Sequence, residues 1–350
     1  RACPRARAAD VNPGDEHMEF EGIYPPVITP FKDDQSFDER AWADMIDYQI
    51  ENGAHGVIIG GTTGEFYALT RDERVQQFRK AHDVVGGRVP WLAGVNDLQT
   101  DSVCAYASAA KEAGAGALLL AAPPYSLPTE RELAAHCLRV ERAAKLPIML
   151  YNYPGRTGVM MGEEFLERVG RNPNFCAIKE SSGDIHRIHL LAREFPHIQL
   201  SCGIDDLALE FFVWGARSWV CAAANCALPE TLALYEACVV ERDFEKGCRI
   251  MQALLPLTTV LERGGKFLQC VKFACELQGL PGGAVRLPQR PMTKELRRQM
   301  TDVMLTAKKT VRAIVAESAA RAAPKGPRPV SVDRAPAPAR KRASARATSD

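Results

Sequence analysis

The sequence is first informative through what it lacks. No apolar run in its 350 residues approaches the roughly 20 residues that span a bilayer, and no signal-peptide core follows the first residues. Its eleven cysteines form no C-x-x-C pair, and no cysteines and histidines have the spacing of a zinc site. Cys176, Cys202 and Cys221 lie inside apolar runs, which is typical of reduced core residues. We therefore expect a cytoplasmic protein with no membrane partner and no metal ion.

A strong overall charge is also missing, although the charge is uneven along the chain. The net charge is +1, yet residues 321–350 carry a net +6, so the rest carries about −5. This stretch is rich in Ala, Pro and Arg and has no residues to build a core, so we predict a disordered basic tail over residues 317–350. Residues 1–19 are predicted to be a disordered extension. A basic run is usually only solvated, so we do not expect a nucleic-acid partner.

Short apolar runs recur about every 20 to 35 residues between residues 20 and 228, each followed by a polar loop and a helical pattern. The eight runs are residues 23–29, 56–60, 89–95, 117–122, 147–151, 175–179, 198–202 and 219–223. Apolar strands that alternate with amphipathic helices predict a parallel sheet covered on both faces. Eight such units fit a (β/α)₈ TIM barrel over residues 20–228, with an open doubly wound sheet as the alternative.

The pattern changes after the eighth run, because residues 229–316 contain only helical periodicity. The expected helices are residues 229–242, 244–260, 267–277 and 293–315. We expect them to form a C-terminal helical appendix beside the barrel, with a loop at residues 279–283.

The sixth apolar run ends in a lysine, Lys179, within the sequence FCAIK at residues 175–179. A lysine at the inner end of a buried strand is costly unless function requires it. Burial lowers the pKa of a lysine toward roughly 7 to 8, and the free amine can then attack a carbonyl to form a Schiff base. The alternative is a side chain that extends from the strand end into solvent.

Other predicted strands also end in polar groups. The turn GGTTGE at residues 60–65 presents hydroxyl and backbone N–H groups that suit a carboxylate or a phosphate, although it lacks the lysine of a P-loop. Tyr151 ends the fifth run, where its hydroxyl could pass protons or simply fill the core. Arg156, on the next loop, could hold a substrate carboxylate or face water. Since active groups of barrels gather at the carboxyl ends of the strands, these groups and Lys179 favour Schiff-base chemistry on a 2-oxo acid.

Two other patterns are weaker. His186 and His189 are spaced to lie on one helix face, but without a third ligand they indicate surface or packing residues. Asp205 and Asp206 are consecutive, so their side chains point in different directions, and we expect a loop or a helix cap rather than a carboxylate pair.

Four motifs, in this order, resemble the dihydrodipicolinate synthase/N-acetylneuraminate lyase family of class I Schiff-base aldolases. They are GTTGE at residues 61–65, YNYPGRTG at 151–158, IKESSGD at 178–184 and GIDDL at 203–207. The resemblance covers about residues 20–315. It implies a (β/α)₈ barrel with C-terminal helices, a homotetramer built as a dimer of dimers, and no organic cofactor or metal.

The resemblance also implies catalytic roles for residues in these motifs. Lys179 would form the Schiff base, Tyr151 would relay protons, and Thr62 would be its hydrogen-bonded partner. Thr63 would bind the carboxylate of pyruvate. Tyr125 would reach across a dimer interface to complete the proton relay.

Three further residues are expected to bind substrate. By resemblance to the synthase branch, Arg156 would bind the carboxylate of the aldehyde, and Val220 would present its backbone carbonyl to the site. Gly203, at the end of the seventh strand, is expected to line the same site.

The sequence departs from the family pattern at Phe66, Tyr67 and Pro124 and in residues 93–98, so we do not expect feedback inhibition by lysine. The favoured function is condensation of pyruvate with an aldehyde such as aspartate semialdehyde. One alternative is cleavage or dehydration of a 2-keto-3-deoxy sugar acid or related 2-oxo acid by the same lysine. An alternative of another class is a non-catalytic barrel with a basic binding tail.

Overall fold

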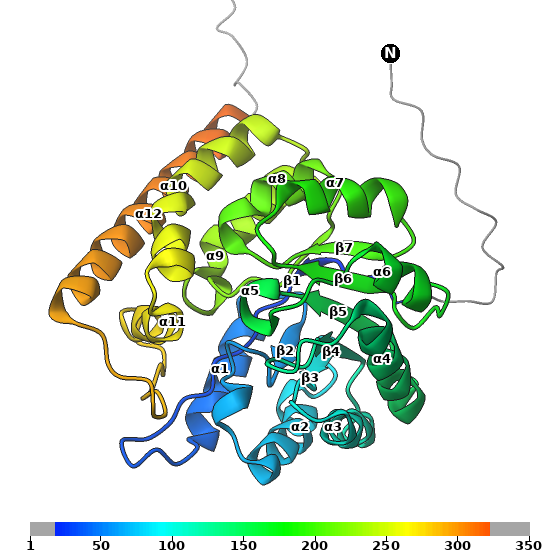
Figure 1. Cartoon of the computed structure of the whole chain (residues 1–350). Helices are drawn as coiled ribbons and strands as arrows, with labels where there is room; N and C mark the ends of the chain where they lie inside the picture. Colours follow the sequence, from blue (N-terminus) through cyan, green and yellow to red (C-terminus); the bar gives the residue numbers. More distant parts are fainter. Residues whose placement is uncertain (1–17, 323–350) are drawn as a thin grey trace, which may run out of the picture.

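The computed structural model of the chain describes residues 18–322 (Figure 1). Eight parallel strands form one curled sheet in the order β1-β8-β7-β6-β5-β4-β3-β2. The strands are β1 (Gly22–Ile23), β2 (Val57–Ile59), β3 (Trp91–Gly94), β4 (Ala117–Ala121), β5 (Ile148–Asn152), β6 (Ala177–Glu180), β7 (Gln199–Cys202) and β8 (Ser218–Trp219). A parallel bridge between Pro26 and Ile58 joins the two edges of the sheet. The predicted (β/α)₈ barrel is therefore confirmed.

The first strand is shorter than the apolar run that predicted it. Pro25 and Pro26 have no N–H group to donate to a ladder, so regular pairing stops after Ile23. The chain still follows the barrel wall, because Val27 N–H donates to the carbonyl of Ile58 at 2.9 Å.

Helices alternate with the strands and surround the sheet (Figure 1). Those of the barrel are α1 (Glu39–Glu51), α2 (Arg71–Val85), α3 (Thr100–Glu112), α4 (Glu130–Ala144), α5 (Pro154–Thr157), α6 (Glu163–Val169), α7 (Ile185–Glu194) and α8 (Ala208–Val213). Capping boxes start α2 and α4, where Thr70 pairs with Glu73 and Thr129 with Glu132. Short turns lie at η1 (Phe66–Ala68) and η2 (Asp205–Leu207).

The barrel has two separate apolar cores. The larger packs the outer faces of the strands against the helices and includes Ile178. The smaller fills the barrel and includes Met149, Tyr151 and Ala177. Because side chains alternate along a strand, Lys179 lies on the same inward face as Ala177, two residues earlier.

Four further helices follow β8. The first packs against β1 and α1 and completes the ring of barrel helices, and the other three lie along one side of the barrel, with α10 and α12 packed together (Figure 1). The four are α9 (Ala224–Tyr235), which continues into the π-helical turn η3 (Glu236–Val240), α10 (Phe244–Arg263), α11 (Phe267–Glu276) and α12 (Lys294–Ala322). The expected appendix is present, but α12 runs past the predicted boundary at residue 316, supported by an ion pair between Arg249 and Glu317 at 2.5 Å. The predicted extension up to residue 17 and the predicted tail beyond residue 322 lie outside the described residues.

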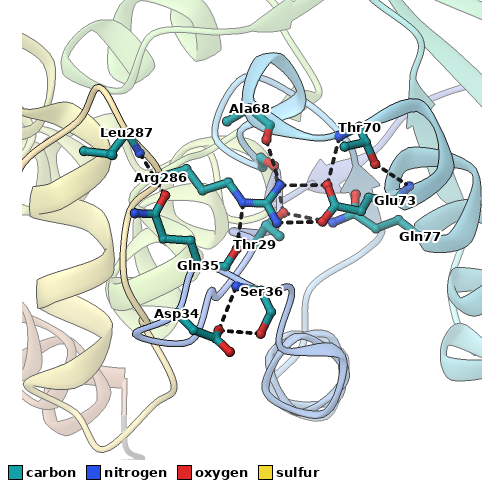
Figure 2. Close-up of polar contacts among 11 residues, drawn as sticks. Thr29, Asp34, Gln35, Ser36, Ala68, Thr70, Glu73, Gln77, Arg286 and Leu287 are labelled. Carbon is teal, nitrogen blue, oxygen red and sulfur yellow. Dashed lines mark hydrogen bonds and ion pairs between the residues drawn. The ribbon is translucent and has the colours of Figure 1, made fainter.

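Arg286, in the loop between α11 and α12, joins these helices to the barrel loops (Figure 2). Its guanidinium donates to the carboxylate of Glu73 at 2.6 and 2.7 Å, to the carbonyl of Gln35 at 3.0 Å and to that of Ala68 at 2.8 Å. Hydrogen bonds from Arg286 hold the pKa of Glu73 below its usual range. Since Ala68 ends the turn that follows β2, the C-terminal region braces the loop that carries the predicted Thr62 and Thr63.

Candidate active site

The register of β5 and β6 places the two principal candidates side by side. Tyr151 and Lys179 are paired residues on adjacent strands, and both point into the barrel. The Lys179 side chain is only 6% exposed, and its Nζ lies 3.9 Å from the centre of the Tyr151 ring. Burial lowers the pKa of Lys179 to about 8, against the opposing effect of Asp205 and Glu262. A useful fraction of free amine is therefore present near neutral pH.

A pocket at the carboxyl end of the barrel surrounds this lysine. Its lining comprises Thr62, Thr63, Tyr151, Tyr153, Arg156, Lys179, Ser181, Gly203, Ile204, Asp205, Val220, Ala222, Glu262 and Phe267. The pocket therefore contains every site residue expected from the sequence except Tyr125.

The phenol of Tyr151 is held between hydroxyl groups. Burial raises its pKa, while hydrogen bonds with the side chains of Thr62 and Ser181 work in the opposite direction. The phenol is therefore neutral near pH 7, and it can donate or accept a proton along a chain of hydroxyls.

Buried contacts hold the turn after β2 in place. Glu65 adopts a left-handed backbone conformation and is fully buried, where it pairs with the ammonium group of Lys272 at 2.5 Å. Thr29 donates its hydroxyl to the carbonyl of Gly64 at 2.7 Å. These contacts hold Thr62 and Thr63 in the pocket wall before any ligand binds.

Arg156 lines the pocket from the segment that follows β5. It lies on α5, directly after β5, and its guanidinium is 5.5 Å from the centre of the Tyr153 ring. The Arg156 side chain is exposed, as expected of a group at the entrance rather than the floor of a pocket. Its charge and fork of donors fit a carboxylate.

Gly203 contributes space rather than a functional group. A Cβ atom at this position would lie 2.6 Å from Cγ of Lys179 and 2.7 Å from the carbonyl oxygen of Glu180. Any side chain here would displace the lysine, so the glycine keeps the amine in the pocket.

Two carboxyl groups near the lysine were not predicted as site residues. Asp205 is 1% exposed, and its carboxylate accepts hydrogen bonds from Trp219 Nε1 at 2.9 Å and from Ala223 N–H at 2.8 Å. Its own N–H donates to Oε1 of Glu262 at 3.5 Å. Burial and the negative charge of Asp205 raise the pKa of Glu262 to about 8, and burial also raises that of Asp205.

The sequence offered different signals for these two acids. Asp205 lies in the GIDDL motif at the end of β7. Because Asp206 follows it directly, the pair indicated a loop or a helix cap rather than a site residue. Glu262 lies in the last turn of α10, and no motif marks it. Only the packing of α10 against η2 brings it to the lysine.

Tyr125 does not line the pocket of its own chain. It follows β4 with a left-handed backbone, and its side chain is 93% exposed. The role across a dimer interface stays a prediction.

The two weaker patterns have local partners. His189 stacks on Trp214 with ring centres 4.3 Å apart, and His186 contacts the edge of His189. Asp206 accepts from Arg263 at 2.7 Å. Within residues 18–322, no group of three or more His, Cys, Asp or Glu side chains is arranged to hold a metal ion, and no helix is long and apolar enough to cross a membrane.

Comparison with known proteins gives the same family as the motifs. The model of the dihydrodipicolinate synthetase family matches residues 19–307. The chain belongs to this family. Dihydrodipicolinate synthetase family membership, together with the barrel, makes it a class I aldolase or lyase.

The similarity to several relatives in this family extends over nearly their whole length. The chain is 35% identical over 281 residues to the 4-hydroxy-tetrahydrodipicolinate synthase of Salinibacter ruber, covering 79% of this chain and 91% of that protein. The synthase of the same name from an Exiguobacterium species is 32% identical over 286 residues, covering 81% and 97%.

Solved structures show the same similarity. The 4-hydroxy-tetrahydrodipicolinate synthase of Methylacidiphilum fumariolicum SolV superposes with a TM-score of 0.79 at 28% identity, covering 85% of this chain and 99% of that one. YagE, a prophage protein of the dihydrodipicolinic acid synthase family from E. coli solved in complex with pyruvate, gives 0.78 at 28% identity, covering 83% and 99%.

Proposed function

We propose that this chain joins pyruvate to an aldehyde, or cleaves the product, through a Schiff base on Lys179. The observation that carries the proposal is the buried amine of Lys179, paired in register with Tyr151. A 2-oxo acid offers the ketone that such an amine attacks, and Thr63 with its turn offers hydroxyl and N–H groups for the adjoining carboxylate.

The chemistry balances without a cofactor. Nζ of Lys179 adds to the ketone carbon of pyruvate, and loss of water gives an iminium ion. Removal of a proton from the methyl group gives an enamine, whose carbon attacks the aldehyde while the aldehyde oxygen takes up a proton. Water then hydrolyses the iminium, which releases a 4-hydroxy-2-oxo acid and the free lysine.

Tyr151 is assigned the proton transfers of this sequence. Its hydroxyl interacts with Thr62 and Ser181 and lies beside the amine, so protons can pass between the carbinolamine, the enamine and the pocket. We further propose that Tyr125 enters the pocket of a partner chain in a homotetramer.

The first candidate for the aldehyde is aspartate semialdehyde, which gives the reaction of a 4-hydroxy-tetrahydrodipicolinate synthase. The names of the relatives support it, as does Arg156, whose guanidinium lines the pocket entrance where a second carboxylate would bind.

A specific observation favours a second candidate, a hydroxylated 2-oxo acid of the keto-deoxy sugar-acid type. Glu262 adds an acid to the pocket wall that can hydrogen-bond to hydroxyl groups.

Reductive trapping tests the shared chemistry. We expect borohydride, added with pyruvate, to fix one pyruvate-derived adduct per chain, and peptide mass spectrometry should place it on Lys179. Lys179→Arg should remain unlabelled, whereas the exposed Lys266→Arg should label normally. An unlabelled parent protein, or an adduct on another lysine, would refute the proposal.

A panel of aldehydes and 2-oxo acids then separates the two candidates. Turnover of aspartate semialdehyde far above all other substrates would exclude the hydroxylated class. A protein that lacks residues 323–350 should retain its activity, whereas a non-catalytic barrel with a binding tail predicts that the deletion abolishes function.

A further inference from the structure

We propose that Glu262 is a specificity-determining residue, which hydrogen-bonds to a hydroxyl group on the carbon next to the aldehyde carbon of the second substrate. The inference rests on the proposed Schiff base at Lys179 and extends the second of the two candidate substrates. It assigns a substrate class to the site, namely hydroxyaldehydes and the hydroxylated 2-oxo acids formed from them.

Glu262 lies where it can reach the second substrate. It comes from the last turn of α10, outside the barrel sequence, and its half-buried side chain forms part of the pocket wall together with Lys179, Gly203 and Arg156. A side chain that shares a wall with the reactive amine lies near the carbon atoms that react. It is therefore placed to contact the substituents of those carbons.

Glu262 has few contacts of its own. Its one hydrogen bond within the described residues is a long one, at 3.5 Å, from the N–H of Asp205 to Oε1. No lysine, arginine or histidine of residues 18–320 forms an ion pair with it within 4.0 Å, and the nearby Arg263 pairs with Asp206 instead. The carboxyl group thus keeps hydrogen-bonding capacity toward the pocket.

Electrostatics decide which substituent fits. Asp205 is held as an anion by two N–H donors, and its charge opposes a second negative charge on Glu262. Near pH 7 Glu262 therefore carries a proton, and a carboxylic acid both donates and accepts. A neutral hydroxyl matches this pattern, whereas a methyl group would leave the acid without a partner.

A matched pair of aldehydes tests the assignment, because glycolaldehyde and propanal differ only by a hydroxyl group in place of a methyl group. We expect the ratio of kcat/KM for glycolaldehyde over propanal, with pyruvate as donor, to fall about tenfold or more in Glu262→Leu. In Glu262→Gln, which keeps a donor and an acceptor, the ratio should stay within about threefold of the parent. Glu245→Gln, an exposed change on the same helix, is the control for α10.

A second measurement covers slow turnover of simple aldehydes. The aldol products of pyruvate with each aldehyde compete with pyruvate for Lys179, so their inhibition of pyruvate methyl-proton exchange, followed by NMR, gives the same ratio as a binding preference. Equal losses for both members of the pair in Glu262→Leu, or an unchanged ratio, would overturn the inference. Borohydride labelling of each variant separates the two failures: absence of labelling in the parent refutes the Schiff base, whereas normal labelling with an unchanged ratio refutes only the role of Glu262.

Discussion

The pocket is built from two regions of the chain that reach it in different ways. The ends of β5 and β6 supply Tyr151 and Lys179, whose inward direction follows from the alternation along a strand. The C-terminal region supplies Glu262 to the pocket and Lys272 and Arg286 to the loops behind it. The first region can be inferred from local sequence, whereas the second depends on how helices dock onto a finished barrel.

The difference also separates chemistry from support. The strand ends hold the groups that exchange protons and form bonds, while the C-terminal region adds one acid beside those groups and holds their loops in place. Variants in the two regions should therefore fail in different ways.

The largest effect is expected at Lys179. Lys179→Met removes the nucleophile, so kcat/KM should fall on the order of a thousandfold or more, with no adduct after borohydride treatment. Far-UV circular dichroism should remain unchanged, because methionine fills the same space. Activity within tenfold of the parent would place the covalent chemistry elsewhere.

The next largest effect is expected on the free energy of unfolding, at the buried ion pair between Lys272 and Glu65. Lys272 and Glu65 are 2% and 0% exposed, so Lys272→Met leaves a buried carboxylate without its cation and should lower the free energy of unfolding by about 3–5 kcal/mol. Urea denaturation measures this loss, with the exposed Lys266→Met as control.

The double change of Lys272→Met with Glu65→Leu sharpens the result. Removing both charges also removes their desolvation cost, so most of the lost stability should return. If the double variant is as unstable as the single one, the pair is not what joins α11 to the β2 loop.

A smaller loss is expected at Tyr151. Tyr151→Phe keeps the ring beside Lys179 but removes the hydroxyl that interacts with Thr62, so kcat should fall on the order of a hundredfold. Tyr153→Phe changes a neighbouring phenol of the same pocket, with ring centres 5.9 Å apart, and should have a clearly smaller effect on steady-state turnover. Equal losses in both variants would remove the special role of Tyr151.

The same division explains what sequence can predict here. Runs of apolar residues bounded by turns indicate all eight strands, because each strand is buried on both faces. The residues at the carboxyl end of each run, or just beyond it, then fall at the barrel mouth. Thr62, Tyr151 and Lys179 follow directly from that rule. Glu262 does not, since nothing in the last turn of α10 distinguishes it from the acidic residues on the exposed face of the same helix, such as Glu245. The position of Tyr125 depends on a second chain, which one sequence does not describe.

The smallest predicted effect joins the two regions. Burial lowers the pKa of Lys179 to about 8, against the opposing negative charges of Asp205 and of Glu262, because a negative charge favours the ammonium form. Glu262 gains its charge only as it ionises around its own pKa of about 8, so it acts near the midpoint and above it. The reactive free amine exists above this pKa, so the rate of adduct formation with pyruvate should rise about tenfold per pH unit below pH 8 and level off above it. Glu262→Gln removes the charge that Glu262 gains around pH 8, so the midpoint should move slightly to lower pH, whereas Glu245→Gln should leave it in place. Stopped-flow absorbance of the Schiff base measures both midpoints. A midpoint that stays or moves upward in Glu262→Gln would mean that the strands alone determine the reactivity of the lysine, and that the helices only support the barrel.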